Sequence, residues 1–253
     1  MKMLLLLLIT MICGITSAQS DLVISGVYKW DDLKVEKSGN FDKRQILEGR
    51  TTDDENLNIY ALTIEPEKSL KEKSDDETLI IIKEGDVKVS LKNDYKILSP
   101  GSTVLIMSGD SYEIENIGDS DATFYVFLYK SKYPVDIKRG IEAGGSFITD
   151  WNDLKYQPHD KGGMRQCFNR PTSMAKRFDI HVTTLNPEIK SHEPHTHRAA
   201  EIVLMINGKT EMEIDDGLYK GTDGDLYFLG SNIPHAIKNI GTKPSMYFAI
   251  QWE

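Results

Sequence analysis

The feature that most constrains this chain is an internal repeat that relates its two halves. Residues 30–34 (WDDLK) recur as residues 151–155 (WNDLK), 121 positions later. Further along, the offset becomes 123, so that residues 116–118 (NIG) match residues 239–241 (NIG). One register that holds over most of the chain, with a single shift of two residues, indicates a duplication.

Each copy consists of short β-rich segments separated by turn residues. Residues 87–91 and 103–106 are rich in β-branched side chains and are bounded by Gly, Asp or Asn. Residues 202–206 are continuously apolar but too short for a helix, as in a buried strand. Repeated short strands with Gly turns are typical of jelly rolls, and the duplication implies two of them. We therefore predict an all-β protein with two tandem barrels, residues 19–140 and 141–253.

The first residues have the pattern of a secretory signal peptide. A single Lys precedes an apolar run, and small residues ending at Ala18 follow it. We expect residues 1–18 to be removed and the protein to be secreted or periplasmic, without further contact with the membrane. A membrane anchor fits less well, because a bilayer core needs roughly 20 apolar residues. A lipid on Cys13 also fits less well, because the bulky Ile12 precedes it.

Composition excludes several classes of protein. The chain has 39 acidic and 30 basic residues, a net charge of −9, whereas a nucleic-acid binder needs a basic face. Two cysteines are too few for a disulfide scaffold or a cysteine-rich zinc module. One of them, Cys167, lies in an alternating, strand-like segment with no base nearby in the sequence. We interpret it as a buried structural thiol and not as a nucleophile.

The histidines are confined to the second copy, and none precedes His159. His195 and His197 are two residues apart, so on a strand their rings would share a face. Glu201 opens the apolar segment that follows, and His235 comes later in the same copy. Three imidazoles and one carboxylate suit a divalent transition metal such as Mn, Fe, Ni, Co or Zn.

The spacing of these residues resembles a known family. The order His-x-His, three residues, Glu, six residues, Gly, which ends at Gly208, resembles the first motif of the cupins. Residues 224–239 resemble the second motif. The resemblance implies two double-stranded β-helix barrels, a bicupin, with the metal inside the second barrel. The ligands it implies are His195, His197, Glu201 and His235.

The first copy lacks this set of ligands. The matching positions hold Glu72, Ser74, Thr78 and Tyr112. Two carboxylates without an imidazole hold a transition metal poorly, so we expect the first barrel to be metal-free and to act as a packing partner or wall. The neighbouring acidic run, residues 75–77, is interpreted as a solvated turn.

Three other polar residues of the second copy are interpreted as structural. The counterpart of His181 is Tyr60, so this position does not require a ring nitrogen. His192 lies in a Pro-containing turn and is placed outside the ligand set. Asn239 is expected to secure a turn, because Asn116 persists at the same position of the first copy.

Candidates for substrate contact lie on other strands. Tyr247 and Gln251 are four residues apart on the last strand and share a face. Arg165 and Arg170 could each clamp a carboxylate. The overall layout also resembles the ureidoglycine aminohydrolase family, which implies manganese in the second barrel. That family has Glu, His, His and Gln as ligands, and its substrate-contacting Lys and a pocket Tyr are replaced here by Gln251 and Met212, so the substrate does not carry over.

Two classes of function follow. The first is an exported, metal-dependent enzyme acting on a small polar or anionic metabolite, such as a sugar acid, a carboxylate or a ureido compound. Isomerase, lyase, hydrolase and dioxygenase chemistry all remain open. The alternative is a non-catalytic ligand-binding or sensory module, in which the metal only helps to hold a ligand. By analogy with other cupins we expect a homodimer.

Overall fold

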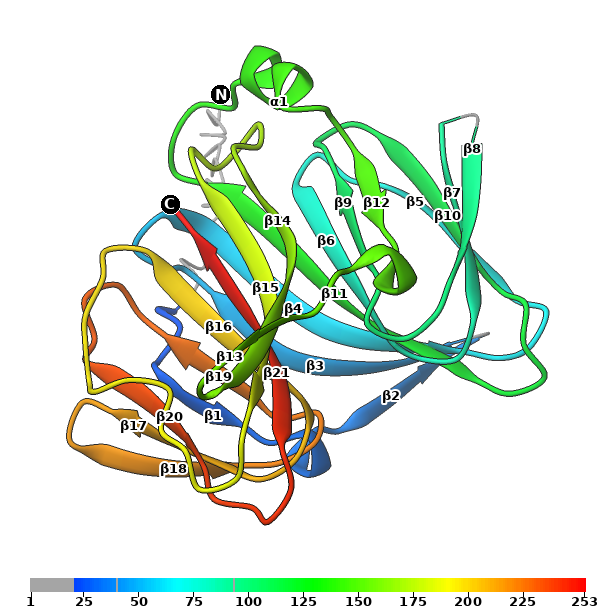
Figure 1. Ribbon diagram of the computed structural model, residues 1–253. Helices are drawn as coiled ribbons and strands as arrows, with labels where there is room; N and C mark the ends of the chain where they lie inside the picture. The colour runs from blue at the N-terminus through cyan, green and yellow to red at the C-terminus, as the bar shows by residue number, and fades with distance from the viewer. Residues whose placement is uncertain (1–20, 40, 93) are drawn as a thin grey trace, which may run out of the picture.

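The computed structural model describes residues 21–39, 41–92 and 94–253. The expected signal peptide, residues 1–18, lies outside this range. The described chain forms two β-barrels side by side, each a jelly roll with one seven-stranded sheet and one smaller sheet (Figure 1). This confirms the predicted all-β class and the pair of jelly-roll barrels. None of the described helices is both long and apolar enough to cross a membrane.

The first barrel contains a seven-stranded and a four-stranded sheet. The larger sheet is formed by β2 (Val35–Ser38), β3 (Phe41–Gly49), β4 (Asp54–Ile64), β6 (Glu77–Glu84), β9 (Thr103–Ile106), β11 (Ala122–Ser131) and β12 (Phe147–Thr149). Its strand order is β12-β9-β6-β11-β4-β3-β2. The smaller sheet is formed by β5 (Ser69–Lys73), β7 (Val87–Leu91), β8 (Asp94–Leu98) and β10 (Ser111–Asn116). Its strand order is β5-β10-β7-β8.

The second barrel follows the short helix α1 (Ile137–Glu142) and repeats this plan. Its larger sheet is formed by β1 (Gly26–Tyr28), β13 (Gln157–His159), β14 (Gly162–Arg170), β15 (Phe178–Leu185), β16 (Ala200–Asn207), β19 (Leu226–Leu229) and β21 (Ser245–Trp252). The order is β1-β19-β16-β21-β15-β14-β13. The smaller sheet is formed by β17 (Thr210–Ile214), β18 (Gly217–Gly221) and β20 (His235–Asn239). Its order is β18-β17-β20.

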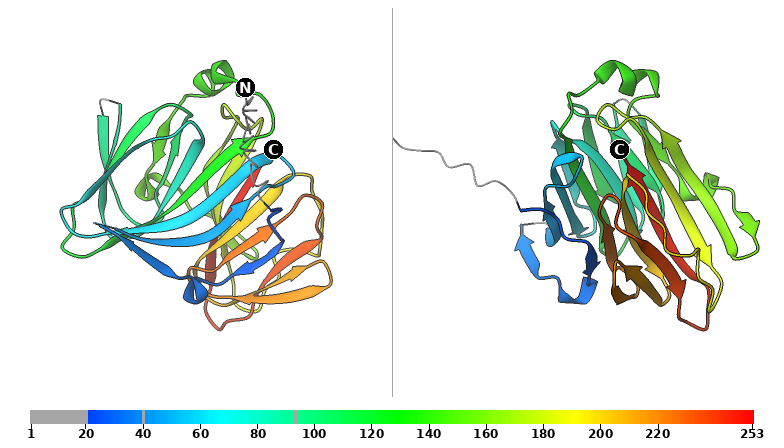
Figure 2. Two further views of the ribbon diagram at one scale, coloured as in Figure 1. Left: turned by 180° about the vertical axis from the view of Figure 1, so that it is seen from behind. Right: turned by 90° about the vertical axis from the view of Figure 1, so that its left-hand side faces the viewer.

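The two larger sheets pack against each other (Figure 2). One buried cluster joins Ile59 and Phe127 of the first barrel to Ile180 and Phe248 of the second. A second buried cluster fills the interior of the first barrel, and a third fills the interior of the second. Successive side chains of a strand point to opposite faces of its sheet, so each larger sheet serves the shared core on one face and its own barrel on the other.

The barrels exchange their opening strands. Strand β1 precedes the first barrel in sequence, but it pairs with β19 of the second. Strand β12 precedes the second barrel, but it pairs with β9 of the first. The boundary near residue 140 that we predicted from the sequence does not include this exchange. A strand that pairs with the edge of a sheet far away in the sequence leaves no local signal.

The repeated tryptophans anchor the exchanged strands. The backbone N–H of Trp30 donates to Asp225 Oδ1 at 2.9 Å, and its ring lies against Gly224. Trp151 has the equivalent position in the first barrel, where its ring lies against Gly101. The repeated WDDLK and WNDLK segments therefore mark two equivalent contacts between the halves.

A strand bulge shows the duplication at atomic detail. Nε2 of Gln45 donates to the carbonyl oxygens of Leu47 and Ile59 at 3.0 and 3.2 Å, across an irregularity in β3. Gln166 makes the same two bonds across the matching irregularity in β14, at 3.0 and 2.9 Å. Both bulges, and the glutamine that stabilises each, lie 121 residues apart.

The acidic run 75–77 is not a solvated turn throughout, because Glu77 is fully buried. Its carboxylate accepts hydrogen bonds from Thr172 Oγ1 at 2.6 Å and from the backbone N–H of Ser173 at 2.8 Å. It also accepts one from the hydroxyl of Tyr129. Glu77 occupies the position of Ala200 in the second copy, so it faces the other barrel, and these bonds join the two halves.

The tryptophan anchors lead to a prediction with a matched control. Gly101 (φ +92°) and Gly109 (φ +82°) both have left-handed backbones, but only at Gly101 would a Cβ lie 2.5 Å from Trp151; at Gly109 it meets nothing within 4 Å. We expect each alanine variant to lose about 1–2 kcal/mol of unfolding free energy from backbone strain. Gly101→Ala should lose about 2 kcal/mol more through overpacking. Urea denaturation measures both, and equal losses would contradict a tight anchor.

Candidate metal centre

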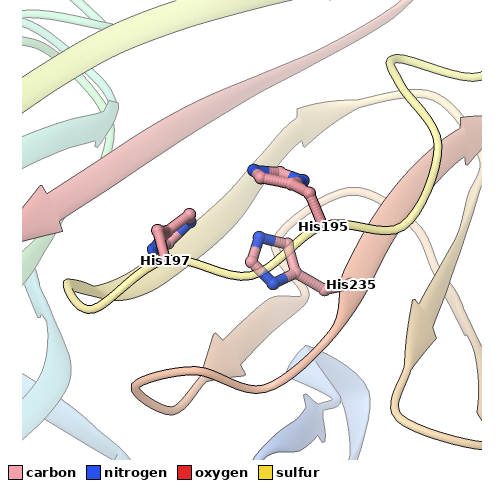
Figure 3. Close-up of side chains that lie close together, drawn as sticks. All are labelled: His195, His197 and His235. Atoms are coloured by element: carbon pink, nitrogen blue, oxygen red, sulfur yellow. The ribbon is translucent and has the colours of Figure 1, made fainter.

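Three histidines converge at one end of the second barrel (Figure 3). His195 and His197 lie in the loop between β15 and β16, and His235 begins β20. The backbones of His195 and His235 exchange two N–H···O bonds, of 3.2 and 3.1 Å, which hold the loop beside the strand. A nitrogen of each ring lies within 4.8 Å of the others, so the three histidines could hold a metal ion.

A buried carboxylate completes the cluster. Glu201, on β16, is 8% exposed, and its Oε2 lies 3.0 Å from His197 Nε2 and 3.3 Å from His235 Nε2. Gln251, on β21, donates to the same oxygen from its Nε2 at 3.0 Å. The four residues that the sequence predicted as ligands therefore lie together.

Backbone carbonyls orient two of the rings. His197 Nδ1 lies 2.8 Å from the carbonyl oxygen of Ala199, and His235 Nδ1 lies 2.8 Å from that of Ile233. A carbonyl only accepts, so each Nδ1 carries a proton and, in the neutral ring, each Nε2 keeps a free lone pair. His235 Nε2 is buried and has no hydrogen-bond partner. This orphaned acceptor is what a divalent metal would satisfy, and such outer hydrogen bonds are typical of metal-ligating histidines.

The electrostatics favour an ionised carboxylate at Glu201 and a neutral ring at His195. Burial raises the pKa of the Glu201 carboxyl, but its contacts with the His197 and His235 rings and with the Gln251 amide outweigh burial and lower it to about 2. Burial lowers the pKa of His195, and the neighbouring imidazoles lower it further. The carboxylate is therefore ionised at neutral pH, and the His195 ring is held in the neutral form that binds metals.

A cavity of about 210 Å³ opens beside the cluster. Five of the six histidines line it, and the sixth, His197, contacts Glu201. The exposed His159 and His192 mark its mouth, and the buried Met212 and Tyr247 mark its inner end. The uneven distribution of histidines in the sequence thus corresponds to one place in the structure.

The predicted substrate contacts fall into two groups. Tyr247, Gln251 and Met212 line the cavity. Arg165 does not, because its guanidinium lies over the ring of Trp151, 4.9 Å from the centroid. Arg44 lies over Trp30 in the same way at 5.0 Å, so Arg165 belongs to the repeated tryptophan anchor.

Arg170 is also placed away from the cavity. Its Nη2 donates to the carbonyl oxygen of Gly145 at 2.6 Å, and its guanidinium lies 3.7 Å from the ring centroid of Phe147. Both contacts belong to the segment that connects the barrels. Arg170 therefore holds the connector instead of facing a ligand.

Four cavity residues with basic side chains were not predicted as site residues. His159, Lys161, His181 and His192 all line the cavity. Side chains of a strand alternate between its two faces. On β15, Ile180 faces the shared core, so its neighbour His181 faces the barrel interior. His159 and Lys161 come from the hairpin of β13 and β14. The signal that could have found the histidines is their confinement to one half of the chain.

The first barrel shows what replaced these ligands. Tyr112, at the position of His235, is buried among apolar side chains such as Ile80 and Phe124. Tyr60, at the position of His181, packs against the same cluster. Apolar side chains therefore surround the place that the histidines occupy in the second barrel.

A salt bridge ties the histidine loop to the first barrel. Arg198, the neighbour of His197, contacts both carboxylate oxygens of Asp53 at 2.6 Å. Asp53 is 4% exposed and precedes β4. A bidentate pair of this kind fixes direction as well as distance. The loop that carries His195 and His197 is thus oriented partly from outside its own barrel.

Cys167 gives a prediction about reactivity. Burial raises the pKa of its thiol to about 12, and the nearby Asp179 adds to this. The thiolate is the reactive form, so Cys167 should resist alkylation at pH 8 in the folded protein and react after unfolding in urea. Mass spectrometry of the peptide that contains Cys167 measures both rates. Rapid labelling of the folded protein would contradict a structural role.

Comparison with known proteins agrees with the fold. Residues 181–251 match the Cupin domain family. The structure of protein Ylba from E. coli has a TM-score of 0.72 at 14% identity, and the match covers 94% of this chain and 95% of that one. Oxalate decarboxylase from Lactobacillus farciminis, in a formate complex, has a TM-score of 0.70 at 12% identity, covering 90% and 86%.

AerE from Microcystis aeruginosa has a TM-score of 0.68 at 13% identity, covering 87% of this chain and 97% of that one. No curated protein matches the sequence significantly. Identities this low relate the structures by fold alone. The second barrel therefore carries a cupin domain, and the chain as a whole shares its jelly-roll fold with these proteins.

Proposed function

We propose that the second barrel binds one divalent metal through His195, His197, Glu201 and His235 and acts as an enzyme on a small anionic metabolite. The observation that carries the proposal is the buried, unpartnered Nε2 of His235 beside an ionised carboxylate. Manganese is the first metal to test, because the donors are imidazole and carboxylate with no thiolate. Iron, nickel, cobalt and zinc accept similar donors.

The charges around the cavity favour an anionic ligand. Lys161 lines it together with His159, His181 and His192. Glu201 is the one carboxylate among the described lining residues, and it belongs to the proposed ligand set. A volume of about 210 Å³ is below the range of roughly 300–1,000 Å³ that is typical of drug-sized pockets. A small carboxylate, sugar acid or ureido acid fits both the charge and the size.

His181 is the residue best placed to move a proton. Its ring lines the cavity, and its Nδ1 lies 3.7 Å from Asp179 Oδ1. An imidazole with a carboxylate behind it has the arrangement of a general base. Asp179 is held by Gln166 at 2.8 Å and by Arg177 at 2.7 Å. A bound divalent metal would supply a Lewis acid for a substrate oxygen.

A ligand-binding or sensory module is the second candidate. The same cavity and metal would then hold an anion without turnover. In either case the proposal includes export, because residues 1–18 have the charge and apolar pattern of a signal peptide. Activity decides between the two candidates.

The first prediction here concerns metal content. Protein purified without added metal should contain about one equivalent of a transition metal, and His197→Ala should lose it while staying folded. Ser74 is the counterpart of His197 in the first barrel, so Ser74→Ala is the matched control and should keep its metal. Elemental analysis and circular dichroism measure content and fold. A metal-free wild type, or a His197→Ala variant with full metal content, would refute the site.

Turnover is tested on a panel of small carboxylates, unsaturated uronates and ureido acids. We expect metal-dependent turnover that a chelator abolishes and that His181→Gln lowers at least tenfold with unchanged metal content. If the metal is present but no compound in the panel is converted, the binding module is the better description.

Gln251 leads to a separate prediction about affinity. Its amide donates to Glu201, and loss of such outer partners typically weakens metal binding 10–100-fold. Gln251→Leu should raise the metal dissociation constant by about that factor. Leucine suits the position sterically, because Leu128 occupies it in the first barrel. Competition with a fluorescent chelator measures the change, and an unaltered constant would show that Glu201 does not need this support.

A further inference from the structure

A second cavity, of about 280 Å³, lies between the two barrels. The repeat relates its lining residues in pairs: Ile81 of the first copy matches Leu204 of the second, and Gly101 matches Gly224. No lining residue is shared with the cavity at the histidine cluster. Any ligand here would therefore occupy a separate place.

The two walls of this cavity differ in polarity. Lys83 stands where the second copy has Ile206, and Tyr125 stands where the second copy has Phe248. These polar side chains come from the first barrel. The second barrel contributes apolar side chains, among them Ile206, Met246 and Phe248. The duplication has thus placed two polar side chains on one wall of the cavity and only apolar side chains at the matching positions of the other.

Both polar residues of this cavity lack a polar partner among the described residues. Lys83 is half-buried as a residue, its Nζ lies 4.7 Å from the ring centroid of Trp30, and no described carboxylate pairs with it. The Tyr125 hydroxyl is buried and has no hydrogen-bond partner. Buried polar groups are normally paired, and a half-buried cation beside apolar surface attracts an anion.

We propose that this cavity binds a small amphipathic monocarboxylate. Its hydrocarbon part would lie against Ile206, Met246 and Phe248, and its carboxylate would pair with Lys83. A volume of about 280 Å³ accommodates a medium-chain fatty acid or an aryl-alkanoic acid. The site is distinct from the proposed metal centre, and it does not require that centre to be active.

Octanoate is the probe, titrated into the folded full-length mature protein by calorimetry and by tryptophan fluorescence, because Trp151 lines the cavity. We expect saturable binding that Lys83→Met weakens at least tenfold. Lys43→Met is the matched control, since Lys43 also lies over an aromatic ring, that of Tyr60 at 4.5 Å, but does not line the cavity. Neutral octanol should bind wild type more weakly than octanoate does, and Lys83→Met should remove that difference.

A second variant tests whether octanoate binds at this cavity or at the proposed metal centre. Octanoate should bind His197→Ala as tightly as it binds wild type. If binding is lost there but unchanged in Lys83→Met, the carboxylate is bound at the metal and the proposal is wrong. Absence of saturable octanoate binding to wild type would also overturn it, while leaving the metal content, and with it the proposed function, unaffected.

Discussion

The contact between the two larger sheets is the constraint on which the rest of the structure depends. Phe178 belongs to this contact, with edge-to-face contacts to Tyr129 of the first barrel at 5.3 Å and to Trp252 of the second at 6.4 Å. Because strand residues alternate between faces, this contact also decides which residues face the barrel interior. On β16, Ile202 points to the shared core, and so its neighbour Glu201 points to the histidines. Burial on one face of the sheet therefore sets the chemistry on the other.

The first barrel supports the second although its own ligand positions have changed. Tyr112 replaces an imidazole with a buried ring. Two other residues of the first barrel contact the second: Glu77 accepts hydrogen bonds from Ser173, and Asp53 pairs with Arg198 in the histidine loop. The copy without the histidines thus contributes cross-barrel contacts that hold the other copy. The loop that carries His195 and His197 is held in part by Asp53, which lies 145 positions before Arg198 in the sequence.

The sequence was sufficient for the class of fold and for the candidate ligands, because both have local signals: a repeat with a fixed offset, and histidines with fixed spacing. It was insufficient where distant pairing decides the outcome. Arg165 was predicted to contact a substrate, but its guanidinium lies over the ring of Trp151 in the same repeat. Glu77 was placed in a solvated turn, but a shift of one residue along a strand reverses the face, and the face it occupies is buried. The hairpin that brings Lys161 to the cavity has no motif that could have revealed it.

The exchange of opening strands has a consequence for how the chain folds. Gly26 pairs with Phe228, so the earliest of the described strands cannot pair until a partner about two hundred residues later has been synthesised. Phe147 pairs with Leu105, so the first barrel cannot close its sheet until the second half has begun to emerge. Such long-range pairings slow folding, because the entropy of closing the loop is lost before the contacts form. Neither barrel can finish before the other has started, which makes the duplicated chain a single folding unit.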